Sequence, residues 1–234
     1  MAITDLRLTT LQVVNAVQER LGVNKTANLY QTKHVRVLVD LLNEVQDELS
    51  DFGQWQELYA ETTIAVSASL ATYAVDPTDD SIVNTIYEVT FASAISPLYV
   101  QSIEDIRRLR RLRSRGEPRQ FGVVGVDDVT GNPKIEIYPT PGISQDGKPM
   151  VIAFYRKPPI LQVSADSATV LPFPGQMLIN GLYAKALLEE NGGEPTPQFQ
   201  MAMATYERQK TEALNRFNAD TGTDLWFIPG RGQR

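Results

Sequence analysis

The residues with the strongest binding chemistry are a dense group of arginines near the middle of the chain. Residues 103–119 hold seven arginines against three acidic residues, a local charge of +4. Guanidinium groups form bidentate contacts with carboxylates and phosphates, which predicts contact with an acidic protein surface or a nucleic-acid backbone. A solvated helix anchored by its apolar side chains is the alternative. The candidate contact residues are Arg107, Arg108, Arg110, Arg111 and Arg113.

Acidic residues form a second candidate site on a predicted helix over residues 29–52. Asp40 and Glu44, for example, lie on adjacent helical turns, where two carboxylates could share acid–base work. The sequence supplies no glycine-rich loop or histidine partner for such a pair. A solvated face or a protein interface is therefore favoured over catalysis. The candidate interface residues are Asp40, Glu44, Asp47, Glu48 and Asp51.

The composition excludes several classes of enzyme. The chain has 234 residues, no cysteine and a single histidine, His34. Without cysteine there is no disulfide, thiolate zinc site, iron–sulfur cluster or cysteine nucleophile, and one histidine cannot make a two-histidine metal site. His34 lies near the start of a predicted helix, where a surface or cap position is expected. No phosphate-binding glycine loop is present either. We predict a protein that is not an enzyme and has no cofactor or metal.

The charge is unevenly distributed along a chain of ordinary globular composition. The 22 Lys+Arg and 28 Asp+Glu give a formal charge of −6, so removing the +4 of residues 103–119 leaves −10 elsewhere. Apolar residues make up 42% of the chain, which is typical of a globular protein. We expect no membrane segment and, from the first residues, no secretory signal.

The last fifteen residues carry an apolar cluster without helical or strand periodicity. The cluster lies between Gly222 and Gly230, and two arginines follow it. An extended segment flanked by glycines cannot bury large aromatic side chains within itself. It either folds back on its own domain or inserts into a partner as an anchor. The residues concerned are Leu225, Trp226, Phe227, Ile228, Arg231 and Arg234.

Apolar spacing places helices at both ends of the chain. Helices are predicted over residues 5–21, 29–52, 175–191 and 198–219. In the second, apolar residues from Val35 to Phe52 recur at steps of three and four, which indicates a seam that packs on another helix. We predict an α+β protein with a four-helix-bundle-like body. Its parts are a discontinuous helical body (1–56 and 170–219), an inserted antiparallel β module (57–169) and an extended tail (220–234).

The inserted module is rich in β-branched and aromatic residues separated by turn residues. A short arginine-rich helix over residues 102–113 is predicted inside it, because Ser102 precedes two acidic residues of a first turn. Loops at 131–133 and 144–148 are predicted as hairpin-type connections. The predicted strands cover residues 57–66, 71–75, 82–91, 97–100, 120–126, 134–138 and 150–155.

A set of short motifs, taken in order, resembles the head-to-tail adaptor (connector) proteins of tailed bacteriophages and is similar to their tail accessory factor family. The resemblance covers roughly residues 30–217, and the order of the motifs carries it rather than any single one. The motifs are LLNEVQDEL (41–49), ATYAVDP (71–77), PLYV (97–100), IEDIRRL (103–109), GEPR (116–119), IEIYPTP (135–141), FYRKPP (154–159), LP (171–172) and YER (206–208).

The resemblance implies a structural virion protein in the neck between capsid and tail, made in the host cytoplasm. Members form a ring, commonly dodecameric, that binds the portal protein, extends the DNA channel and receives a tail or nozzle protein below. DNA passes through such a channel without specific binding. In members of the family the C-terminal segment commonly clamps the portal. The tail of this chain departs from the family in sequence, so the same role is expected of residues 225–234 from their composition. The charged residues of 40–51 and 107–113 are then expected at subunit or portal interfaces.

Two other functions stay open from the sequence. A nucleic-acid-binding module could use residues 107–115, although the helix lacks interleaved aromatic residues and the rest of the chain is acidic. Another structural protein of tail completion is the second alternative.

Overall fold

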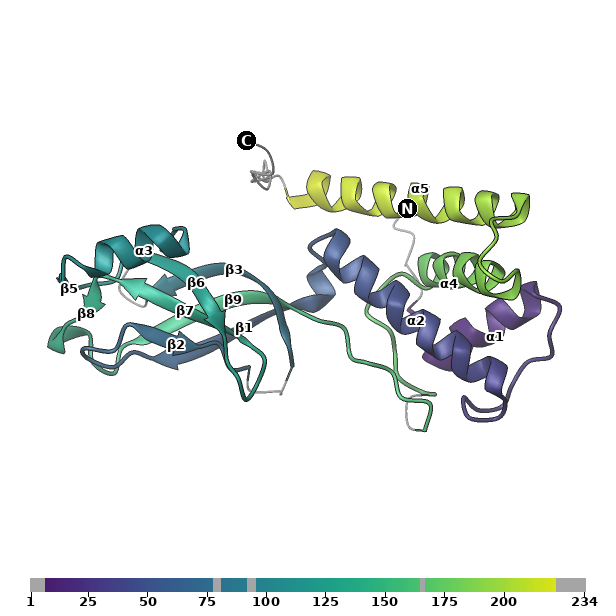
Figure 1. Ribbon diagram of the computed structural model, residues 1–234, viewed down its shortest axis with the longest axis horizontal. Coiled ribbons are helices and arrows are strands. Elements are labelled where there is room, and N and C mark those ends of the chain that lie inside the picture. Colours follow the sequence, from purple (N-terminus) through teal and green to yellow (C-terminus); the bar gives the residue numbers. More distant parts are fainter. Residues whose placement is uncertain (1–6, 78–80, 92–95, 165–166, 222–234) are drawn as a thin grey trace. The chain divides into compact units, whose positions relative to one another are not determined.

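The computed structural model describes residues 7–77, 81–91, 96–164 and 167–221. Its helices and its antiparallel and mixed sheets confirm the α+β class. The chain divides into two compact units (Figure 1). The first combines Met1–Gly53 with Ile160–Arg234, and the second is Gln54–Pro159.

The first unit is built around a central helix, α4 (Gly175–Glu190). This helix contacts each of α1 (Thr10–Arg20), α2 (Lys33–Phe52) and α5 (Pro197–Thr221). Buried residues occur nearly all round α4, as a helix surrounded by others requires. A regular four-helix bundle is not confirmed.

Close packing in this unit depends on one glycine of α4. A Cβ atom at Gly181 would lie 2.8 Å from the Tyr206 ring and 2.9 Å from a Val45 methyl group. The predicted seam of α2 is confirmed over most of its length, because Val35 and Leu49 and the seam residues between them are almost completely buried. Phe52 at its end is 38% exposed.

The two N-terminal helices begin later than predicted. The first starts at Thr10 rather than residue 5, because Thr9 is extended, pairs with Val170 and caps the helix through its hydroxyl group. The second starts at Lys33 rather than residue 29, because the Thr32 hydroxyl accepts a hydrogen bond from the backbone N–H of Val35. Helices α4 and α5 match their predicted ranges to within two residues.

The second unit is a sandwich of two sheets with a helix on one outer face. One sheet has the order β1–β9–β3, from Tyr59–Ala65, Pro149–Arg156 and Val83–Phe91. The other has the order β2–β7–β6–β4, from Thr72–Ala74, Pro133–Tyr138, Gln120–Val126 and Tyr99–Val100. Inward side chains of both sheets, such as Phe121, Ile135, Ile152 and Phe154, form one core.

The module is not purely antiparallel as predicted. Strand β4 pairs parallel with β6, because helix α3 (Ile103–Arg110) crosses over between them. The short strands β5 (Arg115–Gly116) and β8 (Thr140–Pro141), which the sequence analysis missed, are also parallel. Two 3₁₀ turns complete the unit, η1 (Gln56–Leu58) and η2 (Ile143–Gln145).

One of the two hairpin predictions is correct. The loop at 131–133 joins β6 to β7, which pair antiparallel. The loop at 144–148 is not a hairpin connection, because it leads into β9, whose partners are β1 and β3. The chain changes sheets there.

Candidate interaction surfaces

Helix α3 forms where the arginine-rich segment is capped at its start. The Ser102 hydroxyl accepts a hydrogen bond from the backbone N–H of Asp105, at 3.2 Å. Acidic residues lie in the first turn and arginines in the last, which suits the helix dipole at both ends. The helix ends at Arg110, three residues before the predicted end, and Arg113 has a left-handed φ of 49°.

Helix α3 lies on the outer face of the sheet β2–β7–β6–β4, against β6 and β7 (Figure 1). Ile106 is fully buried over Gly122 of β6, where an added Cβ atom would lie 2.9 Å from Ile106 Cγ1. The neighbouring inward residue Phe121 belongs to the core on the other face of the sheet. Arg110 forms an ion pair of 3.3 Å with the buried Glu136, the register partner of Gly122.

The other arginines of this segment are exposed. Arg107, Arg108, Arg111 and Arg113 form no ion pair with any residue that the structure describes. Leu112, an apolar residue that follows the helix, is 70% exposed. The segment is therefore anchored mainly through Ile106 and presents several guanidinium groups that a partner could bind.

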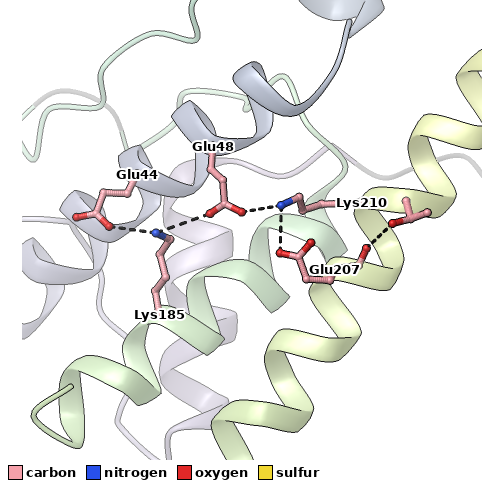
Figure 2. A network of polar contacts seen from close by, with 6 residues as sticks. Glu44, Glu48, Lys185, Glu207 and Lys210 are labelled. Carbon is pink, nitrogen blue, oxygen red and sulfur yellow. Dashed lines mark hydrogen bonds and ion pairs between the residues drawn. The ribbon is translucent and has the colours of Figure 1, made fainter. Parts of the chain in front are cut away.

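The acidic face of α2 is partly engaged within the chain, as Figure 2 shows. Glu44 lies 3.2 Å from Lys185 of α4, and Glu48 lies 3.8 Å from the same ammonium group. Glu48 also accepts a hydrogen bond of 2.7 Å from Lys210 of α5, which bonds Glu207 at 3.1 Å. Sequence spacing along α2 could not reveal these lysines, because the fold brings them from more than 130 residues away.

Lys210 is the most buried member of this network. It is 5% exposed, and its ammonium group lies 4.5 Å from the Phe52 ring centroid and 5.0 Å from that of Tyr206. Burial alone would lower the pKa of Lys210, but hydrogen bonds to Glu48 and Glu207 outweigh it and raise the pKa. Burial, and then the charges of both carboxylates, raises the pKa of Tyr206 well above 10. Because its pKa is raised, the Lys210 ammonium group is charged at neutral pH.

The remaining candidates on α2 differ in burial. Asp40, Asp47 and Asp51 are exposed, and His34 is half-buried. Within the described part of the chain, no group of three or more histidine, aspartate or glutamate residues could hold a metal ion. No described helix is long and apolar enough to cross a membrane.

The structure adds a surface that the sequence analysis missed, on the outer face of the sheet β1–β9–β3. The rings of Tyr59, Tyr87 and Tyr155 meet edge to face, with centroids 5.8 to 6.5 Å apart. The Tyr59 hydroxyl donates to Glu61, and Glu88 lies in the same face. These five residues are called the tyrosine–glutamate patch below. The alternation of side chains along residues 59–65 could indicate that Tyr59 and Glu61 share one face of a strand. Tyr87 could not be assigned to that face from sequence, because the strand register shifts between Ile86 and Glu88.

The expected anchor of the C-terminal tail lies outside the described residues. Leu225, Trp226, Phe227, Ile228, Arg231 and Arg234 all belong to it.

The described structure presents exposed arginines on and after α3, the acidic face of α2 and the tyrosine–glutamate patch as candidate interaction surfaces. The family model of the SU10 adaptor protein matches residues 8–232, nearly the whole chain, and the chain belongs to this family. A comparison with curated proteins finds no match. Membership confirms the resemblance to phage head-to-tail adaptors. The protein is thus a phage adaptor and a virion component, of a structural family that is not known for enzymes.

Proposed function

We propose that this adaptor assembles as a ring, commonly of twelve copies in such proteins, which binds the portal and a downstream tail or nozzle protein. The observation that carries the proposal is the exposed set of arginines on and after α3, held on a rigid sheet through Ile106. A closed ring needs two different, complementary surfaces on each copy. Arg107, Arg108 and Arg111 supply one surface that a carboxylate-bearing neighbour fits.

The tail supplies the proposed portal contact. Trp226 and Phe227 are the kind of residues that form interface anchors, and the arginines beyond them suit a rim of polar contacts. Deletion after Asp220 should leave a folded subunit that no longer stays on the portal. Retention on the portal, measured by sedimentation of the complex, would contradict this role.

The charge of the chain suits passage of DNA through the ring. The −10 carried outside residues 103–119 disfavours phosphate contacts, each of which adds salt-dependent affinity. An acidic subunit therefore suits a lumen through which DNA passes without being held.

The test is assembly with the portal protein of the same phage. Native mass spectrometry and negative-stain images should show a rotationally symmetric ring of this protein on the portal. Arg108→Glu with Arg111→Glu should reduce the ring, whereas Arg36→Glu with Arg208→Glu, the same charge change on exposed residues of α2 and α5, should not. A protein that stays monomeric in the presence of portal would overturn the proposal.

The exposed arginines also favour a second candidate, a nucleic-acid-binding module. Binding of labelled duplex DNA that weakens steeply with salt, and that is lost in the Arg108→Glu, Arg111→Glu variant, would support it. Rings that form on an isolated tail but not on the portal would instead indicate another tail-completion protein.

A further inference from the structure

The proposed ring leaves open what the arginines of α3 bind, and this inference rests on that ring. The acidic face of α2 is the weaker counterpart, because two of its five carboxylates, Glu44 and Glu48, already pair with Lys185 and Lys210 of their own chain. A better counterpart combines carboxylates that carry no lysine or arginine partner with aromatic rings on which guanidinium groups can stack.

The tyrosine–glutamate patch meets this requirement through its strand register. Glu61 of β1 and Glu88 of β3 both lie opposite Ala153 of the central strand β9. Adjacent strands are about 4.8 Å apart, so the two carboxylate-bearing backbones stand about 10 Å apart across a small side chain. Neither glutamate forms an ion pair with a residue that the structure describes. The row therefore places one carboxylate acceptor on either side of Ala153.

Aromatic rings border these carboxylates. In the next row of the sheet, Tyr59 lies opposite Tyr155. The ring of Tyr87 contacts both of these rings edge to face. Tyr59 and Tyr87 are 37% and 42% exposed, so their rings are available to a partner. The hydrogen bond to Glu61, followed by burial and the charges of Glu61 and Glu88, raises the pKa of Tyr59 to about 12. Both carboxylates therefore lie close enough to the Tyr59 hydroxyl group to raise its pKa.

We propose that α3 of one copy docks on the tyrosine–glutamate patch of the next copy in the ring. Guanidinium groups stack on aromatic faces and form bidentate hydrogen bonds with carboxylates, and the patch presents both beside each other. Arg107 and Arg108 of α3, and Arg111 directly after it, are exposed and able to make this contact. A patch of two carboxylates and three tyrosines is complementary in charge and in chemistry to that group.

The position of the two surfaces on the second unit supports a repeating contact. Helix α3 covers the outer face of the sheet β2–β7–β6–β4, and the patch lies on the outer face of the sheet β1–β9–β3. The core of the sandwich separates them. Two different surfaces on opposite faces cannot join within one copy. They form a head-to-tail contact, which closes into a ring when the rotation per copy permits.

A cross-linking experiment tests the contact directly, because the chain has no cysteine of its own. Leu112→Cys follows α3, and Thr85→Cys lies opposite Tyr155 beside the patch; both positions are exposed. In assemblies with portal, a short bismaleimide should link the double variant into a ladder of covalent multimers. Each single variant, and Leu112→Cys paired with the exposed Ser144→Cys, should give no ladder. Assembled rings without a ladder would overturn the inference and leave the proposed ring standing.

Charge exchange gives an independent test. Variant A carries Arg108→Glu and Arg111→Glu, and variant B carries Glu61→Arg and Glu88→Arg. Each alone places like charges against each other and should lose the ring. An equal mixture should recover it, because A's acidic helix meets B's basic patch and B's helix meets A's native patch. A single chain with all four changes should also recover it, which shows that the substituted chains still fold.

The outcomes separate this inference from the proposed function. If B forms rings like the native chain, or if A and B together do not recover the ring, the patch is not the docking surface of α3. If B forms the ring but no longer holds a tail protein, the patch belongs to that partner and the inference is wrong. If the native chain forms no ring with portal, the proposed function fails first, and this inference fails with it.

Discussion

Removal of the Lys210 ammonium group is expected to destabilise the helical unit more than removal of the Lys185 ammonium group. Both lysines bind Glu48, so the comparison holds one partner constant. Lys210→Met keeps most of the buried aliphatic stem and removes the charge. The side chain of Lys210 is 6% exposed, whereas that of Lys185 is 24% exposed and its partner Glu44 is 60% exposed.

The magnitude follows from the exposure of the carboxylates. A buried hydrogen bond to a charged group contributes about 1.5–3 kcal/mol, and an exposed ion pair contributes about 0.2–1 kcal/mol. Glu48 and Glu207 are 35% and 50% exposed, so each bond to Lys210 lies between these limits. Two bonds of about 1 kcal/mol each give about 2 kcal/mol for Lys210→Met. Lys185→Met should cost less than about 1 kcal/mol.

Urea unfolding at pH 7, followed by far-ultraviolet circular dichroism at the helix band, measures this difference. Helices of the first unit dominate that signal. High salt should remove most of the Lys185→Met effect and little of the Lys210→Met effect, since screening acts mainly on exposed pairs. If Lys210→Met proves no less stable than Lys185→Met, the buried ammonium group does not hold α5 to α2, and the reasoning is refuted.

Three further predictions follow from close packing and from titration. Gly122→Ala should cost about 1–3 kcal/mol and lower the ring yield, because the added methyl group displaces Ile106 and with it α3; a thermal melt and ring counts on the portal measure both. Gly181→Ala should destabilise the helical unit by about 1–2 kcal/mol in urea, since overpacking against Val45 and Tyr206 exceeds the gain in helix propensity. The raised pKa of Tyr206 means that the folded chain keeps a proton that the unfolded chain loses above about pH 10, so stability should fall as pH rises from there. Tyr206→Phe should flatten the decline measured by urea unfolding between pH 9 and 12, and an unchanged slope would contradict this assignment.

The presence of helices with one buried face could be predicted well from the sequence. The residues at which these helices begin were predicted less well. The seam of α2 follows from apolar spacing alone, because each seam residue packs on the same side. The start of α1 depends instead on pairing of Thr9 with Val170, a contact between residues far apart in the chain. Local propensity carries no information about such a contact.

The interaction surfaces also differ in how far the sequence alone could predict them. The arginines of α3 are adjacent in sequence, so their exposure on one helix could be anticipated, and the Ser102 cap indicated where the helix begins. The lysines opposite Glu44 and Glu48 come from α4 and α5, and only the folded chain brings them there. The tyrosine–glutamate patch likewise depends on strand register, which a single strand does not reveal.

The long insertion between α2 and α4 sets an order of events while the chain is being synthesised. The inserted unit begins and ends with partner strands, Tyr59 lying opposite Tyr155, so it can close as soon as β9 leaves the ribosome. Helices α1 and α2 lack their main packing surface until α4 follows at Gly175. We therefore expect the inserted unit to fold first, while the apolar seam of α2 stays uncovered on the nascent chain. During that interval the N-terminal helices are the segment most in need of a chaperone.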